Sequence, residues 1–309
     1  MVIYDKDEKK LVIPASINYE TLNVYQSGYT SGFQSGYTDG LSACTKDYSG
    51  EYFTLTSLEE PHPDFPGILP AIHITHSNIS YRYVHPDGTC SEWFQTSGGS
   101  EDDLWAIDMF VDTKVQFKSD EGALNSLFSN SYMAEYQFSI CGNAESLEYG
   151  DDFIGQDTIK RPGAFTYFFS GCTGLVDASN LVLPAVNLKK NCYLGMFREC
   201  SGLVAAPELP ATNLAESCYN AMFYGCTSLV SAPELPATNL VQTCYRGMFQ
   251  DCSLINHIKC LAVTFSAANS TTNWLSGVSP TGTFETHSTT SWSTGASGIP
   301  EGWTRVNYD

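Results

Sequence analysis

The eleven cysteines of this chain are the first residues that suggest chemistry, because cysteines can pair as disulfides or hold a metal ion. The chain has no CxxC pair, the close spacing that zinc ligands need. Seven cysteines instead recur at two positions of a repeat, most of them 26 residues apart: Cys172, Cys200, Cys226 and Cys252, and Cys192, Cys218 and Cys244. Side chains in register point the same way, and a free Cys packs as a small hydrophobe. We therefore expect two reduced ladders in the core and no metal.

Two carboxylates of the repeat raise the question of catalysis. Glu208 and Glu234 occupy equivalent positions, so they could lie about 5 Å apart, close to the separation that retaining glycosidases use. The pair follows from duplication, however, and nothing in its surroundings would separate the two pKa values as an acid and a nucleophile require. We expect a solvated acidic ridge, no enzyme and no cofactor, with a glycan-degrading enzyme as the least favoured alternative.

Other metal-ligand types are scattered. His73 and His76 are three residues apart in an expected strand, so their side chains would face opposite sides. Acidic residues follow glycines at Glu101–Asp103 and at Asp151–Asp152, and such loops can bind calcium. Neither has the spacing of a known calcium loop, so solvated turns are the simpler interpretation and calcium binding stays open.

Tyrosines provide the best candidate ligand surface of the repeat. Tyr193, Tyr219 and Tyr245 each follow the second cysteine of a coil, so we expect them to form an exposed ridge, with Tyr224 and Arg246 nearby. Aromatic ridges suit sugar rings and protein hot spots. The alternative is that these rings only shield the corner of each coil.

The elements that would position these residues are repeated coils. A run from Cys200 reads CSGLVAAPELPATNLAESCYNAMFYG, and it returns from Cys226 as CTSLVSAPELPATNLVQTCYRGMFQD. This repetition predicts a solenoid over 161–263, in which equivalent residues stack. One stack is a phenylalanine ladder: Phe169, Phe197, Phe223 and Phe249. A capping segment over 264–309 should cover the last coil with its tryptophans.

Between 51 and 160 the pattern changes to short runs that predict strands. In the clearest run, Ile79, Tyr81 and Tyr83 alternate with polar residues, and a Pro-Asp-Gly turn follows. We expect a small immunoglobulin-like β-sandwich in this region. The chain as a whole is then a mainly β protein with short helices.

The segment 25–50 contains a tetrapeptide repeat, YQSGYTSGFQSGYTDG, with one aromatic residue and one glycine in every four. On a helix each interior Gly costs about 1 kcal/mol relative to Ala, so the helix would need partners. Glycines spaced by four favour a symmetric bundle of identical chains, and we expect a homo-oligomer, with a trimer favoured. A flexible linker is the alternative.

Charge and hydropathy exclude two classes of partner. The formal charge of −19 argues against nucleic acid. No apolar run is long enough to span a bilayer, and the charges at Asp5–Lys10 interrupt the stretch that a secretory signal would need. We expect the protein to fold where it is made.

The repeat resembles the BspA-like leucine-rich repeat, whose signature is A-F-x-x-C-x-x-L. The matching segments read MFRECSGL, MFYGCTSL and FFSGCTGL. The resemblance implies a short leucine-rich-repeat solenoid. The chain departs from the family pattern in having Met before the Phe, and in having Pro207 and Pro233 where the usual repeat has a free strand residue. Those prolines predict a short or irregular strand ladder.

The surrounding segments are similar to an arrangement found in gut bacteria and their phages, in which a β-sandwich precedes the repeats. The similar segments are LEYGDDFIGQDT, FFSGCTGLVDASNLVLPA and GIPEGWT. The resemblance implies a non-enzymatic, tail-associated receptor-binding component of a phage or phage-like particle, which recognises a cell-surface glycan or protein. Its segment 1–24 would attach to other tail components. The alternative is a bacterial surface adhesin that binds host proteins.

Overall fold

The computed structural model describes residues 3–5, 10–12, 48–58, 71–74, 77–85, 87–97, 105–108, 114–119, 121 and 137–308. The chain has two compact units, Met1–Asp47 and Tyr48–Asp309. In the first unit, β1 (Ile3–Asp5) pairs antiparallel with β2 (Lys10–Val12). The tetrapeptide repeat and most of the expected attachment segment lie outside the described residues.

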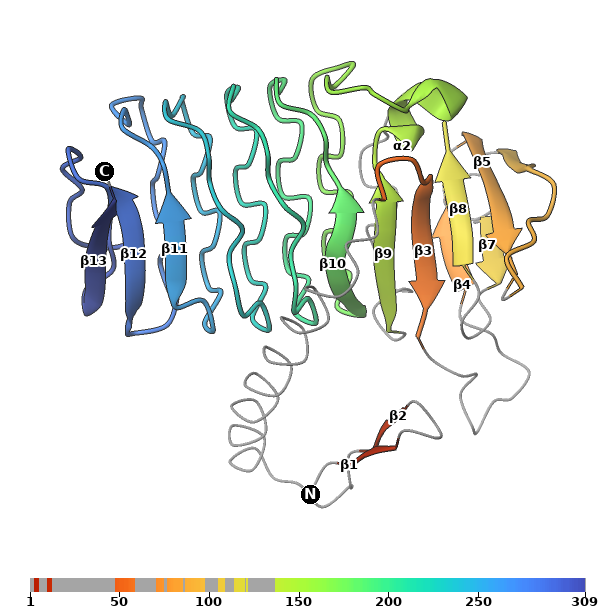
Figure 1. The fold of residues 1–309 in the computed structure, drawn as a ribbon, viewed down its shortest axis with the longest axis horizontal. Coiled ribbons are helices and arrows are strands. Elements are labelled where there is room, and N and C mark those ends of the chain that lie inside the picture. Colours follow the sequence, from red (N-terminus) through yellow and green to blue (C-terminus); the bar gives the residue numbers. More distant parts are fainter. Residues whose placement is uncertain are drawn as a thin grey trace. The chain divides into compact units, whose positions relative to one another are not determined.

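The second unit begins with a six-stranded sheet in the order β10-β9-β3-β8-β5-β6 (Figure 1). Alternate residues such as Phe53, Leu55 and Val115 face the core, as the period of two predicts. The strands are β3 (Phe53–Ser57), β5 (Ser77–Val84), β6 (Phe94–Ser97), β8 (Lys114–Lys118), β9 (Phe138–Asn143) and β10 (Leu175–Val182). A separate two-stranded sheet contains β4 (Ala71–Ile74) and β7 (Trp105–Asp108).

The six-stranded sheet continues into the repeats without a break. The strand β9 pairs in parallel with β10, which belongs to the first coils. Residues Tyr48–Asp309 form one compact unit. In the described part of the chain, helix is confined to α2 (Ser146–Tyr149) and η1 (Gly150–Asp152), which follow β9. The predicted mainly β fold with short helices is confirmed.

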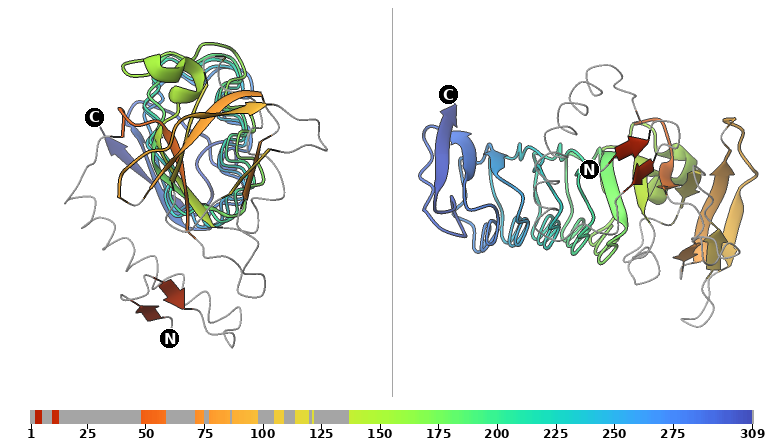
Figure 2. Two further views of the ribbon diagram at one scale, coloured as in Figure 1. Left: turned by 90° about the vertical axis from the view of Figure 1, so that its right-hand side faces the viewer. Right: turned by 90° about the horizontal axis from the view of Figure 1, so that it is seen from below.

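Backbone hydrogen bonds join each coil to the next, and Figures 1 and 2 show the coils stacked in one row. The amide of Tyr193 donates to the carbonyl of Cys218 in the following coil at 3.0 Å. Intervening amides bond within their own coil, as Met196 does to the carbonyl of Tyr193 at 3.2 Å. Left-handed residues such as Gly195, with φ 58°, recur every four positions in this part of the coil. This side of each coil is therefore a succession of tight turns and not an extended strand.

Another side of each coil carries the strand ladder, and it is irregular, as the prolines predict. Single parallel bridges join Asp177 to Ala205 and Ala205 to Ser231. Pro207 and Pro233 follow these positions and have no amide hydrogen to donate, which limits the pairing. Regular parallel pairing returns after the repeats, in β11 (His257–Cys260), β12 (Gly282–His287) and β13 (Trp303–Tyr308).

The ladder cysteines and phenylalanines lie in the core. The buried members are Cys172, Cys192, Cys200, Cys218, Cys226, Cys244, Cys252, Phe169, Phe197, Phe223 and Phe249. The rings of Phe197 and Phe223 are nearly parallel, with centroids 5.5 Å apart. The thiol of Cys226 donates a hydrogen bond to the carbonyl of Phe197 at 3.0 Å. No disulfide is formed by any cysteine of the described residues. Burial raises the pKa of Cys192 to about 12, which keeps this thiol protonated and unreactive.

Tryptophans cover the last coil. The ring of Trp274 stacks on Tyr245 with a centroid distance of 6.1 Å and on Trp292 at 5.4 Å. Trp292 in turn stacks on Phe265 at 4.3 Å. Trp303 is 9% exposed and its indole nitrogen donates to a backbone carbonyl. The segment after the repeats therefore continues the stack of rings and shields the last coil from water.

Two equivalent glycines should respond differently to alanine. Gly195 and Gly247 have φ 58° and 59°, a conformation that costs an L residue about 1 to 2 kcal/mol. A Cβ at Gly247 would have its nearest neighbour at 3.6 Å, whereas a Cβ at Gly195 would overlap a ring carbon of Tyr167. We expect Gly247→Ala to lower the free energy of unfolding only by the cost of the left-handed backbone. Gly195→Ala should lower it clearly more. Urea unfolding measures both, and equal losses would show that the Tyr167 contact does not constrain the turn.

Candidate ligand-binding site

The predicted tyrosine ridge is wrong, because the tyrosines lie in the core. Tyr193, Tyr219 and Tyr245 are 1%, 2% and 0% exposed. Their rings stack from coil to coil at 5.7 and 6.1 Å. The alternation of an extended strand does not apply here, because this segment is a succession of turns, and so the cysteine and the tyrosine after it both point inward. Tyr224 is half-buried and Arg246 is exposed, so these two expected site residues remain at the surface without the ridge.

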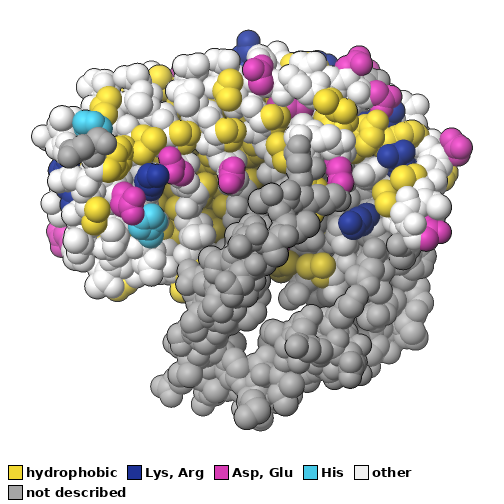
Figure 3. All heavy atoms as spheres, viewed as in Figure 1, with side chains coloured by type: hydrophobic (Ala, Val, Ile, Leu, Met, Phe, Trp, Pro, Cys, Tyr) yellow, Lys and Arg dark blue, Asp and Glu magenta, His cyan; other side chains and the backbone are white. Residues whose placement is uncertain are grey.

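The repeat carboxylates are exposed but do not act as a matched pair. Glu234 accepts an ion-pair hydrogen bond from Lys259 at 2.6 Å, whereas Glu208 makes no ion pair within the described residues. Figure 3 shows acidic and basic side chains interspersed over the coils on the face in view. The exposed ion pair between Glu234 and Lys259 is a solvated surface feature.

The described residues contain no group of three metal-ligand side chains. His76 and Glu101–Asp103 lie outside those residues, and the side chain of His73 is likewise not described. Asp151 is described, and it takes part in a different kind of cluster.

That cluster lies on the outer face of the six-stranded sheet, and we call it the Trp93 cluster. Its members are Tyr52, Arg82, Trp93, Gln116, Lys118 and Asp151. The strand alternation positions most of them: Phe117 and its neighbours on the inner row are buried, so the residues between them point outward. In the ladder, Arg82 of β5 lies directly opposite Gln116 of β8. Trp93 directly precedes β6.

Trp93 is the centre of the cluster. Its ring makes an edge contact with Tyr52 at a centroid distance of 5.1 Å. The guanidinium carbon of Arg82 lies 4.7 Å from the Trp93 centroid and 5.3 Å from the Tyr52 centroid. The ammonium of Lys118 lies 4.5 Å from the Trp93 centroid. Two cations are therefore held against one indole ring by cation–π attraction.

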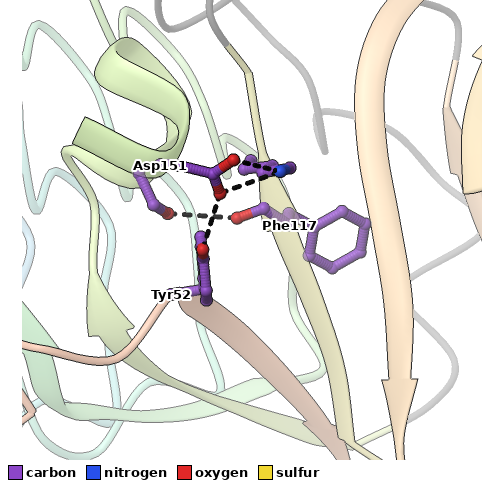
Figure 4. Close-up of polar contacts among 5 residues, drawn as sticks. Tyr52, Phe117 and Asp151 are labelled. Carbon is purple, nitrogen blue, oxygen red and sulfur yellow. Dashed lines mark hydrogen bonds and ion pairs between the residues drawn. The ribbon is translucent and has the colours of Figure 1, made fainter. Parts of the chain in front are cut away.

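Asp151 reaches the cluster from η1 (Figure 4). Its carboxylate accepts hydrogen bonds from the Tyr52 hydroxyl at 2.6 Å and from the Lys118 ammonium at 2.7 and 2.8 Å. The preceding helix α2 is anchored by Ser146, whose hydroxyl donates to the carbonyl of Phe117 at 3.0 Å. The sheet and η1 therefore position the carboxylate together.

These contacts shift the pKa values of Asp151 and Tyr52. The hydrogen bonds from Lys118 and Tyr52 hold the pKa of Asp151 below its usual value, so the carboxylate is charged at neutral pH. Burial, followed by the hydrogen bond to Asp151, raises the pKa of Tyr52 to about 12. The phenol therefore stays protonated at neutral pH and donates its hydrogen bond to Asp151.

The two cations of the cluster differ in their partners. Lys118 is neutralised by Asp151, whereas Arg82 donates through Nε to the neutral Gln116 at 2.9 Å. Within the described residues, no carboxylate forms an ion pair with Arg82. Arg198 offers a comparison, since it lies over Tyr224 at 4.5 Å but is paired with Glu199. Asp151 also attracts Arg82 electrostatically without forming an ion pair with it. With two cations and one carboxylate, the Trp93 cluster carries a net charge of +1 on an acidic protein.

Sequence reasoning did not find this cluster. The alternation of β5 and β8 could have placed Arg82, Gln116 and Lys118 on the outer face. Neither the pairing of β3 with β8 nor the position of Trp93 against Arg82 follows from alternation, because both depend on strand order and register. Asp151, expected in a solvated turn, proved to be an ion-pair partner of Lys118.

The fold and the site define a mainly β protein with stacked, ring-filled coils and a half-exposed cation–aromatic cluster. Comparisons with protein-family models, with curated proteins and with solved structures found no match. No helix in the described residues has the length and hydropathy to cross a membrane.

Proposed function

We propose that this chain is a non-enzymatic binding protein, and that the Trp93 cluster is its ligand-binding surface. The observation that carries the proposal is the half-exposed aromatic and cationic cluster around Trp93, with Arg82 left without a carboxylate partner among the described residues. Aromatic rings and arginines are the residues that dominate binding energy at recognition surfaces. The stacked coils then serve as a rigid support that holds the sheet.

The finer fold assignment belongs to the same proposal. The coils are a BspA-like leucine-rich-repeat solenoid, and the strands before them are an immunoglobulin-like sandwich whose sheet continues into the coils. The AFxxCxxL-like segments and the parallel bridges between coils support this interpretation.

The protein is most simply a tail-associated component of a phage or phage-like particle that recognises a cell-surface glycan or protein. Residues 1–24 attach it to other tail components, and residues 25–50 join identical chains, with a trimer favoured. The resemblance of these segments to such proteins supports the assignment. The alternative location is a bacterial cell surface, where the same cluster would bind a host protein.

Binding to intact cells tests the role of the cluster. Labelled full-length protein should bind a susceptible cell type from a panel of gut bacteria, and Trp93→Ala should weaken that binding about 5- to 30-fold, since an aromatic cation–π contact contributes about 1 to 2 kcal/mol. Arg198→Ala, which removes a similar contact from the coils, is the matched control and should leave binding unchanged. If Trp93→Ala binds as well as the parent protein, the cluster is not the binding surface.

A further inference from the structure

The guanidinium of Arg82, which forms no ion pair with a carboxylate among the described residues, selects among possible ligands. Its Nε donates to Gln116, and its central carbon lies 5.3 Å from the ring centroid of Tyr52 and 4.7 Å from that of Trp93. These contacts fix the orientation of the group without neutralising it. An oriented guanidinium presents a planar fork of donors, which matches the paired oxygens of a carboxylate or a phosphate group.

The rest of the cluster indicates what carries that carboxylate. The indole of Trp93 and the phenol of Tyr52 offer apolar ring surface next to the fork, and sugar rings pack on such surfaces. The side chain of Asp151 is 64% exposed and remains a hydrogen-bond acceptor for hydroxyl groups. A ligand with both hydroxyl groups and one carboxylate would use all of these features together.

The charges also set the direction in which such a ligand lies. Asp151 is ionised and repels an anion, so the ligand carboxylate must lie on the Arg82 side and the hydroxyl groups on the Asp151 side. A polyphosphate chain would need several free cations, whereas the described cluster has one. From this arrangement we infer that the site takes a saccharide that carries a carboxylate, such as a uronic or sialic acid unit.

This inference rests on the proposed function, and a chemical change in the ligand tests it separately. We would measure binding of full-length protein to oligogalacturonate and to sialyllactose, each before and after reduction of its carboxyl groups to alcohols. We expect one of the acidic saccharides to bind, and reduction to weaken that binding about tenfold or more. Added NaCl should weaken only the binding of the acidic form.

Variants of Arg82 test whether its guanidinium group binds the carboxylate. Arg82→Met should bind the acidic saccharide about tenfold more weakly and should no longer distinguish it from the reduced one, because both changes remove the same interaction. Arg82→Lys keeps the charge and should recover only part of the loss, since an ammonium has no planar fork. Arg198→Met is the matched control and should behave as the parent protein.

The outcomes separate the two proposals. If acidic and reduced saccharides bind equally well and Trp93→Ala weakens both, the cluster binds glycans but the inferred carboxylate is wrong. If a glutamate-rich peptide binds and neither acidic saccharide does, the saccharide is wrong. If neither Trp93→Ala nor Arg82→Met changes binding to cells, the proposed function itself is overturned.

Discussion

Replacing Glu145 by Gln should stabilise the protein far more at pH 9 than at pH 4, with the two effects differing by about 4 to 5 kcal/mol. Glu145 is fully buried, and burial, followed by the charge of Glu148, raises its pKa from the ordinary value of 4.5 to about 8. Between these values the folded state holds the proton more tightly than the unfolded chain does. Stability therefore falls as the pH rises from about 4.5 to 8, and the cost stays constant above that range. A glutamine at this position does not titrate, so the variant would escape this cost.

The surroundings of Glu145 explain why the shift is large. Neither carboxylate oxygen has a hydrogen-bond partner among the described residues, and the same holds for the buried hydroxyl of Tyr193. Asp157 raises the pKa of Glu145 further, and Lys160 lowers it without compensating the burial. A buried acid with no partner is held in its neutral form.

Urea unfolding followed by tryptophan fluorescence across this pH range measures the effect. The buried amide of the introduced glutamine has its own cost, but that cost is the same at every pH and cancels in the difference. Glu216→Gln is the control, because the side chain of Glu216 is 41% exposed and its ion-pair partner in the described part of the chain is Lys190, so its effect should stay small. A stability offset for Glu145→Gln that does not change with pH would contradict the prediction.

Replacing Phe223 by Ala should lower the free energy of unfolding by about 3 to 5 kcal/mol. The ring is 0% exposed and lies between Phe197 and Phe249, with both centroid distances at 5.5 Å. The stacked neighbours belong to adjacent coils whose backbones are bonded together, so they cannot close the gap, and a cavity remains.

Phe94→Ala is the matched control for this measurement. Phe94 is 45% exposed at the edge of the six-stranded sheet, so its loss should cost less than about 1 kcal/mol. Chemical denaturation of the two variants at equal protein concentration compares them directly. A similar cost for both would mean that the phenylalanine ladder does not hold adjacent coils together.

The contrast between the two candidate surfaces shows where sequence reasoning was sufficient. The sequence repeat correctly predicted the ladders that contain Cys226 and Phe223, because coils stacked in register bring equivalent residues together. The direction of Tyr219 required the backbone path, and the chain of left-handed turns reversed the expectation of an exposed ring. The buried Glu145 could not be recognised either, because nothing in its local sequence distinguishes it from a solvated acid.

By itself the sequence determined the repeat period, the mainly β character and the composition of the core, because these depend on local patterns and on identical neighbours 26 residues apart. Only the tertiary structure decided that the sheet runs unbroken from β9 into the coils, and that Arg82, Trp93 and Asp151 meet on its outer face. Those contacts join residues far apart in the chain, and strand order, register and turn geometry bring them together. Such long-range pairings are set by the packing of the whole unit, which no local pattern contains.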